Sequence, residues 1–319
     1  GCMMSSIASV SDALYVAQLV AEIRNPLGAP RLETIVFSAR GNQQVTTSTG
    51  LVVAGLVAPP DDLDIVLVPG LMHREPRALF ERLELLHPEI DLLRKLHLRG
   101  VRLAACCSGT FLLAGTGLLD GRRATTSWWL AGAFRHYFPA VRLEPDAMLI
   151  EDREIATTGA ATAIMGLVMR LIAKAGGEEL AQQTSRLLLI DAERQSQAPY
   201  VSQALVDQPR TSLAEKAEDM LQRELHGEIS VARLAEHCGT SERSLLRHFR
   251  SHYGMGPSAH IQRLRVERAK ALLEATQLTF DEVVERCGYS DVSSFRKLFK
   301  RSTTLTPADY RERFRLRAR

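Results

Sequence analysis

The segment VARLAEHCGTS, at residues 231–241, recurs 49 residues later as FDEVVERCGYS, at residues 280–290. In both copies, small or apolar residues fall at i, i+3, i+4 and i+7, which is the spacing of one helical face. These residues are Val231, Leu234, Ala235 and Cys238, and then Phe280, Val283, Val284 and Cys287. A glycine, Gly239 or Gly288, then ends the helix, and a serine two positions later, Ser241 or Ser290, can cap a second one. Helix, tight turn and capped helix is the layout of a helix-turn-helix unit, whose second helix enters the major groove of DNA.

Each repeat is followed by a predicted helix with one apolar side and one basic side. The residues expected to pack inward are Leu245, Leu246 and Phe249, and then Phe295, Leu298 and Phe299. The residues left for the outer side are Arg243, Arg247, His248 and Arg250, and then Ser293, Arg296, Lys297, Lys300 and Arg301. We predict that bases are read by Arg243, Arg247, Ser293, Arg296 and Lys297. Phosphate contacts are predicted for Arg250, Lys300 and Arg301.

Between the two repeats, the 19 residues from Pro257 to Ala275 are predicted to form one helix. Its apolar stripe consists of Ile261, Leu264, Ala269, Leu272 and Leu273. A helix of that length spans about 28 Å, close to the roughly 34 Å of one turn of B-DNA. Two recognition helices held that far apart can enter successive major grooves on one face of the DNA. We therefore expect residues 213–319 to be an all-α domain with two helix-turn-helix units, which reads direct repeats.

The stretch 212–314 resembles the DNA-binding domain of AraC-type transcription regulators. The resemblance rests on residues 234–235, 241–249, Arg265, Ala269, 272–273, 288–291, Phe295, 299–301, 306–307 and 310–311. One departure is Thr304, because the family usually has glycine before its Thr-Pro pair, and we expect an altered turn there. The resemblance implies double-stranded DNA as a partner. It also implies a homodimer, with RNA polymerase as a further expected partner.

The composition indicates two domains, with positive charge gathered in the C-terminal third. The chain has 319 residues, of which 45% are hydrophobic, and a net charge of +3. From Thr211 onward there are 20 Lys and Arg against 15 Asp and Glu, whereas the residues before it carry 20 against 22. That imbalance suits a module that faces phosphate.

No apolar run is expected to be long enough to span a membrane. The longest runs, 51–57 and 160–169, are expected to be buried segments, and we expect a cytoplasmic protein. The five cysteines show no metal-ligand spacing, so neither a metal nor a cofactor is expected. Cys238 and Cys287 occupy equivalent inward positions and are expected to be core residues.

Residues 1–194 alternate predicted strands and helices, which indicates an α/β domain with a mostly parallel, flavodoxin-like sheet flanked by helices. The expected strands are 34–39, 64–69, 101–106, 148–151 and 154–157. The expected helices are 11–24, 77–99, 109–118, 131–137, 160–175 and 178–194. A helix follows almost directly on Gly1, so the first strand expected of such a domain is missing or very short. Residues 195–212, rich in Gln, Ser and Pro, are expected to be a linker.

The informative stretch of this domain runs from a strand into Cys106-Cys107-Ser108-Gly109-Thr110 and then into an apolar helix. A residue between a strand and a helix sits on a sharp elbow, beside the backbone N–H groups of the helix start. Those N–H groups favour a thiolate, so Cys107 is a candidate nucleophile.

Four stretches of this domain resemble class I glutamine-amidotransferase-like (PfpI-type) domains, in particular those fused to AraC-type domains in GlxA-type regulators. They are 64–70, the Cys107 elbow, 121–126 and 194–200. Together with the C-terminal match, the resemblance covers nearly the whole chain. It implies that residues 1–194 sense a ligand and help the protein to dimerise. In such regulators the ligand is often a nitrogenous metabolite, such as an amino acid or a quaternary amine.

Three positions depart from the patterns of related domains. Ser108 stands where peptidase members have histidine, Ser127 stands where GlxA-type regulators commonly have histidine, and Leu71 replaces the second glycine of a pair. The nearest base in the sequence is His73, and a cysteine nucleophile needs a base or a cationic neighbour. We therefore expect no enzyme and no catalytic residue, with Cys107 as the remnant of a nucleophile elbow.

The ligand is expected to bind near Gly70, Cys107, Ser108 and Trp128, where Trp128 and Trp129 could hold a cation by cation–π contact. Two alternatives stay open at this point. One is a cysteine-dependent hydrolase or amidase fused to a DNA-binding domain. The other is an N-terminal domain that only dimerises.

Overall fold

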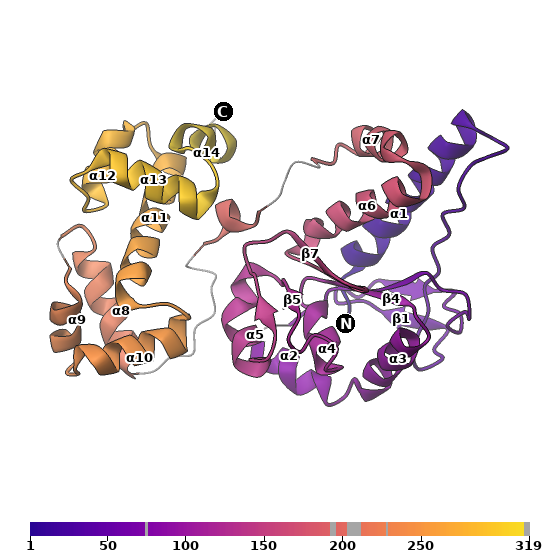
Figure 1. Cartoon of the computed structure of the whole chain (residues 1–319), viewed down its shortest axis with the longest axis horizontal. Helices are drawn as coiled ribbons and strands as arrows, with labels where there is room; N and C mark the ends of the chain where they lie inside the picture. The colour runs from indigo at the N-terminus through magenta and orange to yellow at the C-terminus, as the bar shows by residue number, and fades with distance from the viewer. Residues whose placement is uncertain (74–75, 192–195, 203–211, 228, 316–319) are drawn as a thin grey trace. The chain divides into compact units, whose positions relative to one another are not determined.

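The computed structural model describes residues 1–73, 76–191, 196–202, 212–227 and 229–315. The chain divides into two compact units, Gly1–Gln197 and Ala198–Arg319 (Figure 1). The division falls inside the stretch 195–212 that we predicted to be a linker. Of that stretch, residues 195 and 203–211 lie outside the described residues.

A four-stranded sheet in the order β3-β4-β8-β7 forms the centre of the N-terminal unit. β3 (Ile65–Val68), β4 (Arg102–Cys106) and β8 (Ile155–Thr158) run parallel, and β7 (Leu149–Asp152) pairs antiparallel with β8. Strand β4 is buried along nearly its whole length, as expected of a parallel strand that is covered on both faces. The mostly parallel α/β sheet is thereby confirmed.

Helices cover both faces of this sheet (Figure 1). On one face, α2 (Pro76–Leu83), α3 (His87–Leu98), α4 (Gly109–Gly115) and α5 (Ala131–Tyr137) share an apolar core with β3 and β4. On the other, α1 (Met4–Arg24), α6 (Ile164–Gly176) and α7 (Glu178–Leu187) form a second core with Ala104, Cys106 and Ala156. Short elements complete the unit: β1 (Gln44–Thr46), β2 (Val52–Ala54), β5 (Arg123–Ala124), β6 (Arg142–Leu143), and 3-10 turns η1 (Trp128–Leu130) and η2 (Ala161–Ala163).

The predicted strand 34–39 was wrong. Phe37 makes only an isolated bridge to Val57, and the chain instead pairs β1 with β2 as a hairpin. The run 51–57 is also not buried, since Leu51, Val52 and Val57 are 58%, 54% and 49% exposed. Their apolar composition indicated a core strand, whereas a two-stranded ribbon has room for apolar residues on its open side.

Several helix boundaries also differ from prediction. The helix expected at 77–99 is two helices, because Pro88 lies in the first turn of α3 and so favours a new start there. The helix expected at 178–194 ends at Leu187, and Leu189 has a positive φ of 53°. The helix expected at 109–118 ends at Gly115, and the one expected at 11–24 already begins at Met4.

Helix α1, at 21 residues, is long and apolar enough to cross a membrane by length and composition, which our prediction overlooked. One face of it packs into the second core through Val10, Ala13, Ala17 and Ala21. That face of α1 is therefore part of the core of the α/β unit.

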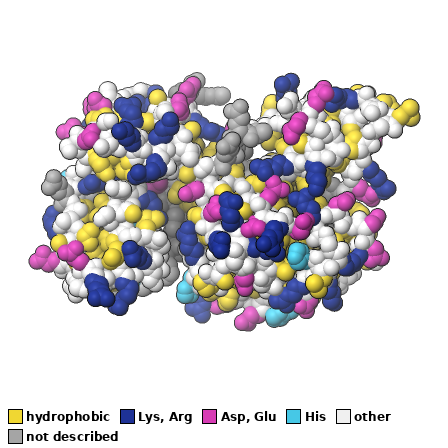
Figure 2. Space-filling view, viewed as in Figure 1, with side chains coloured by type: hydrophobic (Ala, Val, Ile, Leu, Met, Phe, Trp, Pro, Cys, Tyr) yellow, Lys and Arg dark blue, Asp and Glu magenta, His cyan; other side chains and the backbone are white. Residues whose placement is uncertain are grey.

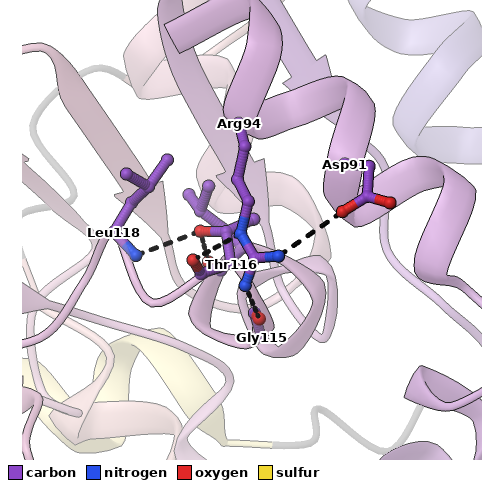
Figure 3. A network of polar contacts seen from close by, with 6 residues as sticks. Asp91, Arg94, Gly115, Thr116 and Leu118 are labelled. Carbon is purple, nitrogen blue, oxygen red and sulfur yellow. Dashed lines mark hydrogen bonds and ion pairs between the residues drawn. The ribbon is translucent and has the colours of Figure 1, made fainter. Parts of the chain in front are cut away.

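A polar network fixes the end of α4 (Figure 3). From α3, the guanidinium of Arg94 donates to the carbonyl oxygens of Thr116 at 2.9 Å and Gly115 at 3.5 Å, and to Asp91 at 3.4 Å. The Thr116 hydroxyl in turn accepts from the Leu118 N–H at 3.1 Å. A cation suits this position, because the last carbonyls of a helix carry partial negative charge.

The described part of the C-terminal unit is all α-helical apart from one 3-10 turn, as predicted. Its elements are η3 (Ala198–Tyr200), α8 (Ser212–Glu224), α9 (Val231–His237), α10 (Glu242–Tyr253), α11 (Pro257–Ala275), α12 (Phe280–Arg286), α13 (Val292–Thr303) and α14 (Pro307–Phe314). Helices α9 and α10 form the first helix-turn-helix unit, and α12 and α13 form the second. Each unit has its own apolar core, and Cys238 and Cys287 lie in them as expected.

Both turns have the predicted backbone. Gly239 and Gly288 have φ of 64° and 75°, the left-handed conformation in which glycine is least strained. Ser241 caps α10 by accepting from the Ser244 N–H at 3.2 Å. In the second unit the prediction of Ser290 was wrong, because Asp291 caps α13 by accepting from the Ser293 N–H at 2.9 Å.

Thr304 occupies the left-handed position at the end of α13, with φ of 63°, where the first unit has Gly254 at 71°. A residue with a Cβ is strained in this conformation by about 1–2 kcal/mol. We therefore expect Thr304→Gly to raise the free energy of unfolding of the C-terminal unit by about 1 kcal/mol, measured by urea unfolding. Gly254→Thr, the reciprocal exchange, should lower it by a similar amount. A loss of stability in Thr304→Gly would show that the threonine contributes contacts that outweigh the strain.

Candidate DNA interface and ligand site

The outer faces of α10 and α13 form the candidate DNA interface. All eight residues that we predicted to contact DNA are exposed: Arg243, Arg247, Arg250, Ser293, Arg296, Lys297, Lys300 and Arg301. The opposite faces are held by Leu245 and Phe249 in α10 and by Phe295 and Phe299 in α13, all of them fully buried. Two residues of α10 are placed differently from the prediction. Leu246, which was expected to pack inward, is only half-buried. His248, which was expected on the outer side, is half-buried and stacks on His252 with ring centroids 5.3 Å apart.

Two interactions position side chains at the start of α13. The guanidinium of Arg296 lies over the Phe280 ring, 4.7 Å from its centroid, which orients it along the surface. Asp291 accepts hydrogen bonds from the Ser294 side chain and from N–H groups of the first turn, and these lower the pKa of its carboxyl group. On the visible face of this unit, Lys and Arg side chains are interspersed with hydrophobic and acidic ones (Figure 2). The positions of the basic side chains on this surface are therefore set by the helices that carry them.

The elbow between β4 and α4 forms the candidate ligand site. Cys107 has a φ of 56°, a strained value for a residue with a side chain, and its N–H donates to the Thr158 carbonyl at 3.0 Å. Next to it, Gly109 lies against strand β3, where an added Cβ would be 2.5 Å from the Pro69 carbonyl oxygen. The elbow is thus held by neighbouring strands on both sides.

Cys107 makes its closest side-chain contact with Ser127, at 2.7 Å between Sγ and Oγ. This serine stands at the position where GlxA-type regulators commonly have histidine. A hydroxyl group cannot take the thiol proton near neutral pH, so the pair lacks the base that an activated cysteine needs. Cys106 points into the other core, and burial raises the pKa of its thiol to about 12.

The predicted ligand residues lie close together but are covered. Cys107, Ser108 and Trp128 are 3%, 1% and 8% exposed. The Gly70 carbonyl accepts from the Met3 N–H at 2.7 Å, and the Ser108 hydroxyl donates to the Leu71 carbonyl at 2.7 Å. A ligand could reach these side chains only if the covering residues moved.

The two tryptophans do not form a parallel box. Their rings are 5.2 Å apart at an angle of 87°, an edge-to-face pair. The Nδ1 of His73 lies 3.1 Å from the Leu71 carbonyl oxygen, so this imidazole contacts backbone. Across the described residues, no cluster of three or more His, Cys, Asp and Glu side chains is arranged to hold a metal.

A second concave surface, which the sequence did not indicate, lies between β7, α6 and α7. This groove has a volume of about 800 Å³ and is lined by apolar side chains, including Met148, Met165, Met169 and Ile190. Arg170, Lys174 and Glu178 add charge at its wall. It is a separate candidate for ligand binding, because residues of the Cys107 elbow do not line it.

Gln197 is a further residue whose role the sequence did not reveal. Gln197 is 1% exposed, and its two amide N–H groups are shared among the carbonyl oxygens of Thr126, Pro145 and Ala147, which lie 2.8–3.0 Å from Nε2. Thr126 in turn donates through its hydroxyl to the Cys107 carbonyl at 2.9 Å. The only signal in the sequence was the family-like stretch 194–200, which gave no reason for a buried amide.

Comparison with known proteins decides the family. Residues 234–313 match the family described as a helix-turn-helix domain. The HTH-type transcriptional regulator GlxA of Rhizobium meliloti (strain 1021) is 32% identical, over 97% of this chain and 92% of the relative. The chain belongs to the GlxA-like group of AraC-family transcription regulators. It is therefore a DNA-binding transcription regulator.

Two solved structures are each similar to part of this chain. An AraC family transcriptional regulator from Pseudomonas putida is 21% identical, with a TM-score of 0.48, over 59% of this chain and 94% of that chain. The DNA-binding domain of AdpA, in complex with a target DNA, is 35% identical, with a TM-score of 0.31, over 32% of this chain and 92% of that chain. The GlxA relative is named as a transcription regulator, in agreement with the expectation that this chain is not an enzyme.

Proposed function

We propose that this regulator reads DNA with α10 and α13 and is controlled by a small nitrogenous metabolite bound to its N-terminal unit. The observation that carries the first part is the repeated geometry of the two helices. Each has a fully buried aromatic face and an exposed face with two or more arginine or lysine side chains. Side chains placed in this way enter a major groove and reach base edges.

Arg247→Ala is expected to weaken binding to a preferred DNA site by about 1–3 kcal/mol and to relax specificity at one base pair. The reason is that arginine reads guanine by two hydrogen bonds, to O6 and N7. The measurement is fluorescence anisotropy on the preferred duplex and on its single-base variants. Arg250→Ala is the matched control on the same helix and should weaken all sequences alike, as loss of a phosphate contact does. Equal weakening on every sequence by Arg247→Ala would instead assign Arg247 to phosphate.

The effector proposal rests on the Cys107 elbow. It keeps the strained backbone of a nucleophile elbow, yet the cysteine contacts the Ser127 hydroxyl in place of a base. The elbow thus keeps its strained backbone but lacks the base that an activated cysteine needs. The adjoining Trp128 and Trp129 provide aromatic surface for a cationic amine once the residues that cover the elbow move aside.

Thermal melting against amino acids, amines and quaternary ammonium compounds tests this proposal. We expect one compound to raise the melting temperature of the wild-type N-terminal unit and to change DNA affinity. Trp128→Ala should abolish the shift, whereas Met165→Trp, which fills the groove beside α6, should leave it intact. The opposite result, in which Met165→Trp abolishes the shift and Trp128→Ala leaves it intact, would place the ligand site in the groove between β7, α6 and α7. No shift with any compound would favour a unit that only dimerises.

We further propose that the regulator acts as a homodimer in the cytoplasm and contacts RNA polymerase at promoters. Support for dimerisation comes from α1, whose outer face carries Tyr15, Leu19 and Ile23 at 65%, 41% and 81% exposed. Residues four positions apart lie on one side of a helix, so these three side chains form one apolar stripe. Exposed apolar stripes of that kind are commonly covered by another protein surface. Light scattering on the purified protein should give the mass of two chains, and Ile23→Glu should give the mass of one. A dimer that survives Ile23→Glu would exclude this face.

A further inference from the structure

The two helix-turn-helix units have separate apolar cores, joined by α11. The first half of α11 contributes Ile261 and Leu264 to the first core, and its second half contributes Val266, Ala269 and Leu273 to the second. A single helix between two small cores resists stretching but leaves bending and twisting to be fixed by other contacts. The orientation of α10 relative to α13 therefore depends on what else joins the units.

One such contact is between backbones. Gly288, in the turn of the second unit, lies against the loop that follows α8 in the first unit. A Cβ added to Gly288 would be 2.8 Å from the carbonyl carbon and oxygen of His226 and from the carbonyl oxygen of Leu225. Gly239, the equivalent glycine of the first unit, has no atom within 4 Å of such a Cβ. The first glycine only ends a helix, whereas the second also allows the two units to meet.

The second contact is made by Arg265, from the middle of α11. Its guanidinium donates through Nη2 to the Gly227 carbonyl at 2.6 Å and through Nε to the Leu225 carbonyl at 3.3 Å. The same guanidinium lies over the Tyr289 ring, 5.1 Å from its centroid. It thus joins the loop after α8 to the turn residue that follows Gly288.

We propose that the contacts of Arg265 and Gly288 with the loop after α8 hold α10 and α13 in one relative orientation, and we call this pair of contacts the lock. The two short DNA sequences bound by α10 and by α13 are called boxes, and the lock determines which spacing between them the regulator accepts. Each added base pair moves the second box by about 3.4 Å and rotates it by about a tenth of a turn. A locked pair of helices cannot follow that change without deforming the DNA, which costs free energy. Without the lock, α11 can bend and twist, and neighbouring spacings become acceptable. This inference rests on the proposal that both helices read DNA.

The test is selection of double-stranded DNA from a random library by the full-length chain, followed by anisotropy on duplexes whose two boxes differ in spacing by one base pair. Wild type should enrich two boxes at one spacing and prefer it by about 10-fold over its neighbours. Arg265→Ala should reduce that preference to within about 3-fold while keeping the sequence of each box. Arg265→Lys, which keeps the charge but not the fork of donors, should fall between them.

Two matched controls accompany these variants. Arg268→Ala removes an exposed arginine from the same helix and should keep the wild-type spacing preference. Gly239→Ala introduces the same left-handed strain as Gly288→Ala without the close approach, so only Gly288→Ala should broaden the spacing. If Gly288→Ala does not fold, as judged by circular dichroism, the two Arg265 variants carry the test.

The outcomes separate the two proposals. A single enriched box with wild type would overturn reading by both helices, and the lock with it. Two boxes at one fixed spacing for wild type and also for folded Arg265→Ala would overturn the lock alone. Equal weakening at every spacing by Arg265→Ala would do the same, because it would make Arg265 a general contributor to affinity.

Discussion

Gly109→Ala is expected to lower the free energy of unfolding of the N-terminal unit by at least about 3 kcal/mol. The methyl group would lie 2.5 Å from the Pro69 carbonyl oxygen and 2.9 Å from that of Val68. Both atoms belong to the backbone at the end of β3, so neither can move aside as a side chain could. The elbow would have to shift away from the sheet. Urea unfolding followed by tryptophan fluorescence measures the effect, because Trp128 and Trp129 lie beside the elbow.

Gly166→Ala is the matched control for this substitution. Gly166 lies on the exposed side of α6, and an added Cβ there has no atom within 4 Å. Alanine has the higher helix propensity, so this variant should gain about 0.5–1 kcal/mol. Similar stabilities for the two variants would mean that α4 packs against β3 less closely than the structure shows.

Phe299→Ala is expected to cost the C-terminal unit about 3–5 kcal/mol. Phe299 is fully buried in the second core and meets the Tyr310 ring edge-to-face at 5.4 Å. Truncation leaves a cavity in the aromatic cluster of this core, beside Phe295 and Tyr310. Because the same core fixes α13, DNA affinity should fall as well. Thermal melting and anisotropy on one sample would record both losses.

Lys300→Ala, at the next position of the same helix, distinguishes the loss of core packing from the loss of a DNA contact. Lys300 is exposed, so its removal should leave the melting temperature unchanged and weaken DNA binding on all sequences alike. A drop in melting temperature as large as that of Phe299→Ala would contradict the assignment of the two faces of α13.

The C-terminal unit was predictable from its sequence because its structure is set by local patterns. The i, i+3, i+4, i+7 spacing, Gly239, Gly288 and Ser241 act within one or two helical turns, and the repeat doubles the signal. Asp291 was missed as a cap because Ser290 looked like the equivalent of Ser241. The contact of Gly288 with the loop after α8 joins residues about 60 positions apart, and no local pattern indicates it.

In the N-terminal unit, the central strands were predictable and the periphery was not. Apolar runs such as Ile65–Val68 identify strands that are covered on both faces. Residues 34–39 have a similar composition, but whether such a run finds a partner depends on distant segments. The burial of Cys107 and Ser108, and the amide contacts of Gln197, likewise depend on chain segments that are far apart in sequence.

The Cys107–Ser127 contact was predictable only in part. The strand-to-helix elbow was visible in the sequence, and family resemblance indicated that the position after the Thr-Thr pair matters. Only the structure places Ser127 against the cysteine, at 2.7 Å.

Methylation protection of guanine N7 on a selected duplex tests the central claim most directly, because N7 lies in the major groove where α10 and α13 are expected to bind. We predict two clusters of protected guanines, about 10 base pairs apart on one face of the DNA. Arg247→Ala should remove protection from one cluster, and Lys297→Ala should weaken it in the other. A single protected cluster, or two clusters on opposite faces of the duplex, would contradict the account.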